Sequence, residues 1–126
     1  MIQSVISSLP APTVGQGKAT VPAIGAVIAT TGALAAGDYT VEISMGFAGV
    51  IAAGKALACE HRNAADAATV AELGLCPAAT NFVQVYGRIT IAANERIRVV
   101  NLAVVGEAAS VASATIRAHL LSSAAL

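Results

Sequence analysis

Cys59 and His61 are the residues whose types and spacing could most readily do chemistry. Side chains two apart on a β-strand share a face, so this thiol and imidazole could act as a nucleophile and its base. The neighbours Glu60 and Arg62 would point to the opposite face, and no third group that would orient the imidazole is evident. We therefore expect no catalytic residue here and interpret Cys59 as a small buried apolar side chain.

Other candidates for chemistry are fewer still. Cys59 and Cys76 match no metal-binding spacing, and the sequence does not decide whether they are bonded. His61 and His119 are too few for a zinc site, which needs three or four ligands. The Gly-Gln-Gly at 15–17 lacks the third glycine of a dinucleotide-binding loop. The sequence thus predicts no cofactor and no metal.

The composition indicates a protein that covers part of its surface. Of the 126 residues, 11% are charged and 56% are hydrophobic, and the formal net charge is +0. Zero net charge gives no long-range attraction to nucleic acid, so no nucleic-acid partner is expected. Soluble domains carry about 25% charged residues, so this chain has little polar surface. With only 3% aromatic residues, its core buries little area per residue. We expect a homo-oligomer, a dimer or trimer.

A membrane span is not expected. The uncharged stretch 19–37 is almost long enough to cross a bilayer, but Pro22, Gly25 and Gly32 interrupt it. Neither an aromatic belt nor a cluster of basic residues flanks it. No basic residue precedes Lys18, so we expect no secretory leader either.

Alternation of apolar and polar residues predicts strands over 38–47, 83–91 and 111–121, because period two is typical of a half-buried strand. A tight turn at 92–94 predicts a hairpin whose return strand covers 95–105. The return strand changes phase at Val99 and Val100, which indicates either a bulge or burial of both faces. Weaker strands are expected at 19–29 and 55–62. The predicted inward-facing residues are Tyr39, Val41, Ile43, Met45, Phe47, Val83, Val85, Gly87, Ile89, Ile91, Ala112, Ala114, Ile116, Ala118 and Leu120.

The segment from Asn63 to Gly74 has two interpretations. Asn63 could cap a helix, Asp66 stands at a capping-box position, and Gly74 could end the helix. The alternative is a long loop between strands.

Six or more strands with glycine-rich turns predict an all-β, jelly-roll-like sandwich. We expect this domain to cover residues 18–126, preceded by an extended N-terminal arm over residues 1–17. Pro10 and Pro12 favour extended chain, and Gly15 and Gly17 loosen it.

Two groups of residues are candidates for contact with a partner. The first is apolar and lies in the arm, where such side chains would be poorly placed in water. The second is basic and lies on the polar faces of late strands, where it either forms a solvated face or pairs with Glu42, Glu95 or carboxylates of a partner. The candidates are Ile2, Val5, Ile6, Leu9, Arg88, Arg96, Arg98 and Arg117.

Four stretches carry a resemblance to a known family. They are Ala36-Gly37-Asp38-Tyr39-Thr40-Val41-Glu42-Ile43, Glu60-His61-Arg62-Asn63-Ala64-Ala65, Ala93-Asn94-Glu95-Arg96-Ile97-Arg98-Val99 and Ala114-Thr115-Ile116-Arg117-Ala118-His119-Leu120. The first resembles the strand opening of jelly-roll modules, and the others resemble small jelly-roll proteins encoded among tailed-phage structural genes. The similarity covers about residues 37–121.

The resemblance implies a decoration, or cement, protein. Such a protein would bind the major capsid protein on the outer surface of the virion and stabilise the shell, after assembly in the bacterial cytoplasm. The family offers no catalytic residue. A trimeric jelly-roll ligand-binding module and a phage tail or fibre component are the alternatives.

Overall fold

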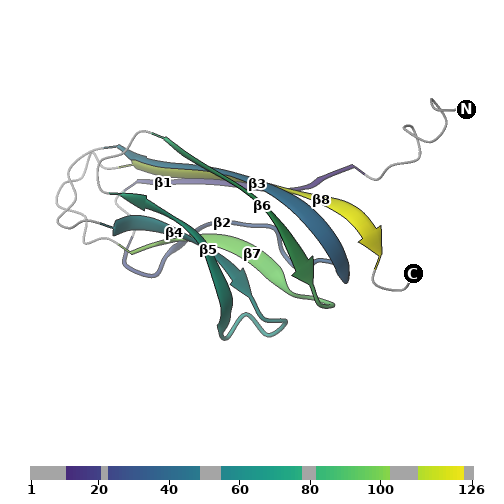
Figure 1. Cartoon of the computed structure of the whole chain (residues 1–126). Coiled ribbons are helices and arrows are strands. Elements are labelled where there is room, and N and C mark those ends of the chain that lie inside the picture. The colour runs from purple at the N-terminus through teal and green to yellow at the C-terminus, as the bar shows by residue number, and fades with distance from the viewer. Residues whose placement is uncertain (1–10, 21–22, 49–54, 78–81, 103–110, 124–126) are drawn as a thin grey trace, which may run out of the picture.

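The computed structural model describes residues 11–20, 23–48, 55–77, 82–102 and 111–123. The described part consists of strands and the turns between them (Figure 1). None of it forms a helix that is long and apolar enough to cross a bilayer. The strands are β1 (Thr13–Thr20), β2 (Val27–Thr30), β3 (Gly37–Ala48), β4 (Lys55–Arg62), β5 (Thr69–Pro77), β6 (Val83–Ile91), β7 (Arg96–Asn101) and β8 (Val111–Ser123).

The strands form two antiparallel sheets that pack face to face. One sheet, here sheet A, has the order β1-β8-β3-β6, and the other, sheet B, has the order β2-β7-β4-β5. Consecutive strands mostly change sheet, so the chain winds as two Greek keys around a common core, which is the topology of a jelly roll. Figure 1 shows the two layers. The predicted jelly-roll-like sandwich is confirmed.

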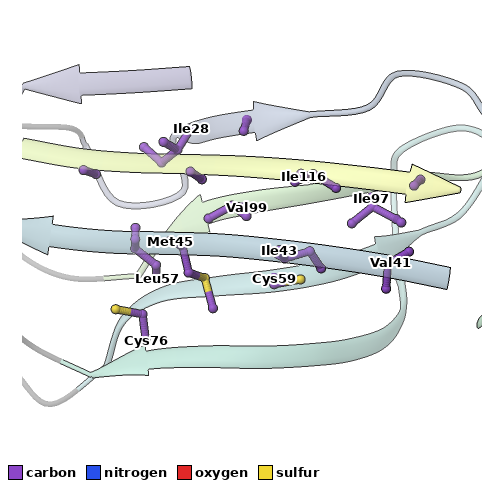
Figure 2. Close-up of a cluster of buried hydrophobic side chains, with 14 of the residues drawn as sticks. Ile28, Val41, Ile43, Met45, Leu57, Cys59, Cys76, Ile97, Val99 and Ile116 are labelled. Carbon is purple, nitrogen blue, oxygen red and sulfur yellow. The ribbon is translucent and has the colours of Figure 1, made fainter. Parts of the chain in front are cut away.

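Alternation explains the core. In β3, every odd position from Tyr39 to Phe47 is at most 3% exposed. In β8 the inward positions are mostly small, so the longer side chains of the facing strands fill the space. Figure 2 shows Ile43, Cys59 and Ile97 directed into this space. Fully buried large side chains of the core are Val41, Ile43, Met45, Phe47, Leu57, Ile91, Ile97, Val99 and Ile116.

The predicted hairpin after β6 is wrong, although its turn is present. Asn94 adopts a φ of 69°, and Glu95 N donates to Ala92 O over 3.1 Å. However, β6 pairs with β3 in sheet A, whereas β7 pairs with β2 and β4 in sheet B. The turn therefore crosses from one sheet to the other. Local sequence cannot distinguish a hairpin from such a crossing, because both need the same tight turn.

The phase change in β7 comes from burial of both faces. Val99 is 0% exposed and Val100 is 3% exposed, although they point in opposite directions. β7 pairs with β4 without interruption, and the irregularity lies on β2, where Val27 pairs with Val100 and Ala29 with Val99. Ile28 is therefore the extra residue of a bulge. The weak strand expected at 19–29 is wrong, because residues 19–20 end β1, residues 27–29 belong to β2 and residues 23–26 form no strand. The strand expected at 55–62 is β4.

The helix predicted from Asn63 to Gly74 is absent. Asn63 does cap backbone groups, since its Oδ1 accepts from Ala67 N over 2.9 Å, but the caps close a loop. Asp66 takes a φ of 54°, which ends any right-handed turn there. Gly74 lies inside β5, which pairs with β4. The loop interpretation is therefore the correct one for residues 63–68.

The predicted boundary between arm and domain falls inside β1. Residues 13–17 form the first half of β1 and pair with β8, so the expected boundary after Gly17 is wrong. Gly15 and Gly17 are strand residues whose backbones lie against the carbonyls of Thr30 and Ile28 in β2, a distance that leaves no room for a Cβ. The arm residues Ile2, Val5, Ile6 and Leu9 lie outside the described residues.

Candidate functional site

The Cys59 and His61 side chains share the inner face of β4, as predicted. Cys59 is 0% exposed and His61 is 6% exposed. His61 Nε2 lies 2.8 Å from Glu95 Oε1, so a third group that the sequence did not reveal does orient the imidazole. Glu95 comes from the turn between β6 and β7. The sequence suggested Glu95 as a partner of an arginine. Glu95 lies beside β4 because the β6–β7 turn crosses from sheet A to sheet B.

The electrostatics of this group argue against nucleophilic chemistry. Burial, reinforced by the charges of Glu60 and Glu72, raises the pKa of the Cys59 thiol to about 12. A protonated, inaccessible thiol is a poor nucleophile. The backbone N–H of Ala92 donates to Glu95, and this bond together with His61 holds the pKa of the Glu95 carboxyl below its usual range. The arrangement ties the β6–β7 turn to β4 and buries both the thiol and the imidazole.

The remaining sulfur and imidazole groups form no metal centre. Cys59 and Cys76 are both free and buried, which answers the question of their bonding, and burial raises the pKa of Cys76. His119 lies on the outer face of sheet A, in register with Thr40 on β3. Among the described residues, no group of three His, Cys, Asp or Glu could hold a metal ion.

The four predicted arginines do not form one surface. Arg96 and Arg98 lie on β7, on the outer face of sheet B. Arg88 and Arg117 lie on β6 and β8, on the outer face of sheet A. The two pairs therefore point away from each other, on opposite sides of the sandwich.

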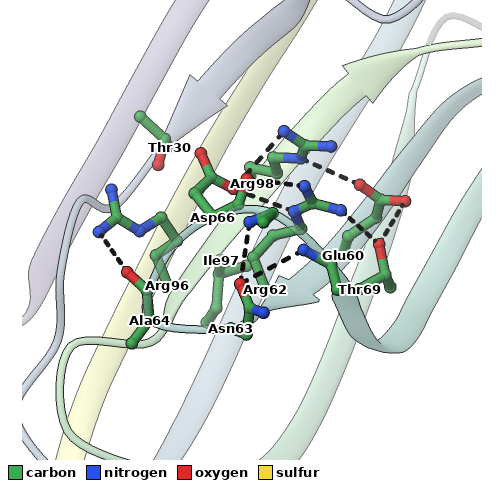
Figure 3. A network of polar contacts seen from close by, with 12 residues as sticks. Thr30, Glu60, Arg62, Asn63, Ala64, Asp66, Thr69, Arg96, Ile97 and Arg98 are labelled. Atoms are coloured by element: carbon green, nitrogen blue, oxygen red, sulfur yellow. Dashed lines mark hydrogen bonds and ion pairs between the residues drawn. The ribbon is translucent and has the colours of Figure 1, made fainter.

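On sheet B the charges pair with one another (Figure 3). Arg98 Nε lies 3.0 Å from Glu60 Oε1, and its Nη1 lies 3.5 Å from Asp66 Oδ1. Arg62 Nε donates to Asp66 Oδ1 over 2.9 Å, and Arg62 Nη1 donates to Thr69 Oγ1 over 2.8 Å. The hydrogen bond from Arg62 is the main reason why the pKa of Asp66 is lowered. These residues are here called the sheet B network, which links β4, β5, β7 and the 63–68 loop.

The sheet B network was not predicted as such. The sequence allows Arg98 either a solvated position or a pair with Glu42, Glu95 or a partner's carboxylate, whereas it pairs with Glu60 and Asp66 of its own chain. Arg96 Nη2 donates to Ala64 O over 3.3 Å, while its buried Nε has no hydrogen-bond partner in the described part of the chain. The turn of the 63–68 loop, in which Asp66 N donates to Asn63 O over 2.9 Å, brings Asp66 close to Arg62.

On sheet A the polar side chains surround a shallow hollow of about 400 Å³. β1, β8 and β3 lie side by side, which aligns Gln16 with Thr115 and Ser44. In the next row Lys18 aligns with Ser113 and Gly46, so small residues form the floor. Phe82, just before β6, lines the other side and is 58% exposed.

Comparison with known proteins adds a likeness of structure only. No family model and no characterised protein sequence matches the chain. Fourteen chains of known structure are similar to it. One is the crystal structure of the Podospora anserina GH26-CBM35 β-(1,4)-mannanase, with 14% identity and a TM-score of 0.40 over 90% of this chain and 29% of that one. The chain thus spans less than a third of that protein, and no argument about function rests on this likeness.

Proposed function

We propose that this chain is a non-enzymatic structural protein that binds the outer surface of a phage capsid and stabilises the shell, with the major capsid protein as its partner. The fold is a jelly-roll sandwich. The resemblance of the sequence to small phage jelly-roll proteins suggests that the assembly is a phage capsid. Assembly would take place in the cytoplasm of the bacterial host. The observation that carries the proposal is an exposed apolar patch at one end of sheet B.

This patch, here called the end patch, consists of Ile24, Val27 and Leu102. Their exposed fractions are 63%, 45% and 39%. Gly25 N donates to the carbonyl of Asn101 over 2.7 Å, which brings the 24–27 segment alongside the end of β7. The three side chains therefore come from adjoining segments and expose apolar surface together.

The energetics favour a protein partner for the end patch. Burying an aliphatic side chain of this size contributes roughly 1.5–3 kcal/mol, so covering three would supply several kcal/mol toward binding. No charged residue belongs to the patch, so its contact would lack the strong salt dependence that charge attraction gives. A repeated shell subunit that offers an apolar surface matches these properties, because many weak contacts on one shell add up.

The state of the Cys59 thiol is consistent with the non-enzymatic part of the proposal. The Cys59 thiol is buried and its pKa is raised, and the His61 imidazole forms a hydrogen bond with Glu95. Both groups contribute to packing between the sheets. Substituting Cys59 by Ala should therefore lower stability by about 1 kcal/mol, with no loss of any biological role.

The test requires the capsid. If a neighbouring gene encodes a major capsid protein, the two are co-expressed, the shells are purified on a density gradient, and the bound chain is quantified. Ile24→Asp and Leu102→Asp should reduce the bound fraction about tenfold or more, since each puts a charge into an apolar contact. Val70→Asp is the matched control, because Val70 is 53% exposed but lies at the opposite end of β5 from the row that contains Val27. Equal binding by all variants would refute the proposal.

The arm provides a second test. We propose that Ile2, Val5, Ile6 and Leu9 pack on the shell or on a sister subunit. Deleting residues 1–12 leaves β1 intact, since it starts at Thr13. The truncated chain should fold and bind shells more weakly. If it binds as the full chain does, the arm has no docking role.

A second candidate function, binding of a small ligand, is favoured by the hollow on sheet A. An exposed aromatic ring opposite hydroxyl, amide and amino groups suits a polyhydroxylated molecule such as a saccharide, because sugar faces stack on aromatic rings while hydroxyls form hydrogen bonds. Phe82→Ala should abolish chemical-shift changes at Ser44 and Thr115 when saccharides are titrated. An absence of shifts in the unmodified protein would eliminate this candidate.

A further inference from the structure

The edges of the two sheets differ in how they are protected. An unpaired edge exposes a row of N–H and C=O groups to which another chain can add a strand. At the β1 edge, Gly15 and Gly17 pack directly on the backbone of β2. At the β2 edge, the strand is only four residues long and carries a bulge. The β1 edge also carries the exposed charge of Lys18, so neither edge is a flat, uncharged template.

The β5 edge is protected in another way. Its pairing with β4 shifts register at three places, and it ends in Pro77. Bulges twist a strand away from a flat partner, and proline offers no N–H. Glu72 adds an exposed charge in the middle of the strand.

The β6 edge has no bulge, no proline and no close backbone contact of the kind that protects the other edges. Its nine residues pair with β3 in unbroken register, from Ile91 with Gly37 to Val83 with Met45. The strand contains no proline and no lysine, and its one charged residue is Arg88. In the part of the chain that the structure describes, no strand lies beyond it. A long, regular and nearly uncharged edge is what strand addition requires.

We propose that β6 pairs antiparallel with β6 of a second copy of this chain, centred on Gly87, so that the two four-stranded A sheets become one continuous sheet across a twofold axis. Gly87 is the middle residue of Val83–Ile91, so this register is the one in which all nine residues overlap. In this register Gly87 faces Gly87 of the second copy, and Val83 faces Ile91.

The outer face of this pairing is self-complementary. Tyr86 of each copy lies opposite Arg88 of the other, which places a guanidinium beside an aromatic ring twice, a favourable cation–π arrangement. Tyr86 is 64% exposed, and its hydroxyl donates to Gln84 Oε1 over 2.8 Å, which holds the ring over the strand. Gln84 lies opposite Thr90, and these polar side chains can exchange a hydrogen bond.

The inner face also fits. Val85 lies opposite Ile89, and both are partly buried apolar residues that pack against the core. Pairing would extend the apolar layer across the axis and bury their remaining surface. A register centred on Arg88 would instead place two like charges directly opposite each other, which is destabilising. Charge and burial thus both select the register centred on Gly87.

The proposal concerns self-association and stands apart from shell binding, so each can fail without the other. The mass of the full chain is measured by sedimentation velocity over about 1–100 μM. The unmodified protein should be a dimer at the upper end. Tyr86→Arg faces Arg88 with a like charge and should weaken the dimer about tenfold or more. Combining Tyr86→Arg with Arg88→Glu creates two opposite-charge pairs and should restore it.

The control is Ala71→Arg, at another exposed position on the protected β5 edge, which should leave the dimer unchanged. A monomer at every concentration, or an oligomer that Tyr86→Arg does not affect, overturns the proposal. Cross-linking tests the register separately. Gly87→Cys should form an interchain disulfide on mild oxidation, since opposed Cα atoms in a ladder lie about 4.5–5.5 Å apart. Thr90→Cys faces Gln84 and should not. Equal cross-linking of both variants refutes the register.

Discussion

The two long sides of the sandwich are built differently. On one side β1 and β2 approach so closely that backbone meets backbone, and only glycine is tolerated at positions 15 and 17. On the other side β5 and β6 meet through side chains, where a Cβ added to Gly74 would lie 2.6 Å from Val85 Cγ2. The first side is closed by contact between main chains, whereas the second is closed only by side chains.

We infer that the β1 and β2 side contributes mainly to stability, whereas the β5 and β6 side offers an edge to which a second chain can bind. The backbones of β1 and β2 have little room to move, so a substitution of Gly15 or Gly17 should lower the free energy of unfolding. Side chains between β5 and β6 can change conformation. The pairing of β5 with β4 is bulged, and the sheet B network supplies further bonds that hold β5 on the sheet. Only β6 is left both regular and uncovered among the described strands.

The largest effect is expected on the closed side. Gly17→Ala places a methyl group against the carbonyl of Ile28, and backbone must shift to accept it. We expect a loss of roughly 3 kcal/mol in the free energy of unfolding, at the upper end of overpacking costs. Urea denaturation measures it. A loss under about 1 kcal/mol would show that β1 and β2 can separate, and the contrast between the two sides would disappear.

A smaller loss is expected where the sheet B network holds β5. Arg62 is 9% exposed and donates to Asp66 and Thr69. Arg62→Met keeps most of the volume and removes those bonds, so we expect about 2 kcal/mol of destabilisation in urea. Arg117→Met on sheet A is the control and should change stability by less than about 0.5 kcal/mol, because Arg117 is exposed and an exposed charge pair, even with Glu42 opposite it on β3, contributes little. Equal losses would mean that the network contributes nothing.

Acid should lower the stability that Asp66 and Glu95 contribute. The pKa values of Asp66 and Glu95 are lowered in the folded protein, so unfolding takes up protons as the pH falls. Their contribution is complete above about pH 5 and is lost progressively as the pH falls through the lowered pKa values. Thermal unfolding between pH 7 and pH 3 should show this decline, and Asp66→Asn should make it shallower. A slope unchanged in Asp66→Asn would contradict the role given to the Arg62 bond.

The smallest effect is expected at the open edge. A Cβ at Gly87 would lie 4.0 Å from Val41 Cγ2, an ordinary contact. Gly87→Ala should change the free energy of unfolding by less than about 0.5 kcal/mol when measured together with Tyr86→Arg, which keeps the chain monomeric. A loss similar to that of Gly17→Ala would mean that the β6 edge is as confined as β1.

Strands and their inner faces were predictable because each depends on its own alternation. β3, β6 and β8 lie where the pattern placed them, with Tyr39, Phe47 and Ile116 buried as expected. The errors share a cause. The β6–β7 turn and the 63–68 loop carry local signals that suit two structures, and pairing with distant strands decides between them.

The candidate site was less predictable than the fold. The face shared by Cys59 and His61 followed from spacing along one strand. Glu95 could not be predicted as their neighbour, since 34 residues separate it from His61 and only the crossing between sheets joins them. The four arginines were correctly placed on polar faces, but which sheet each face belonged to depended on topology.

By itself, the sequence determined the period-two pattern, the small size of the β8 side chains and the low content of charged residues, because these are properties of single positions or single strands. The tertiary structure alone decided which strands are neighbours, and with them the pairing of Arg98 with Glu60 and the exposure of the β6 edge. The physical reason is that alternation fixes which way a side chain points from its own strand, whereas neighbours are chosen by how two whole sheets bury their faces against each other.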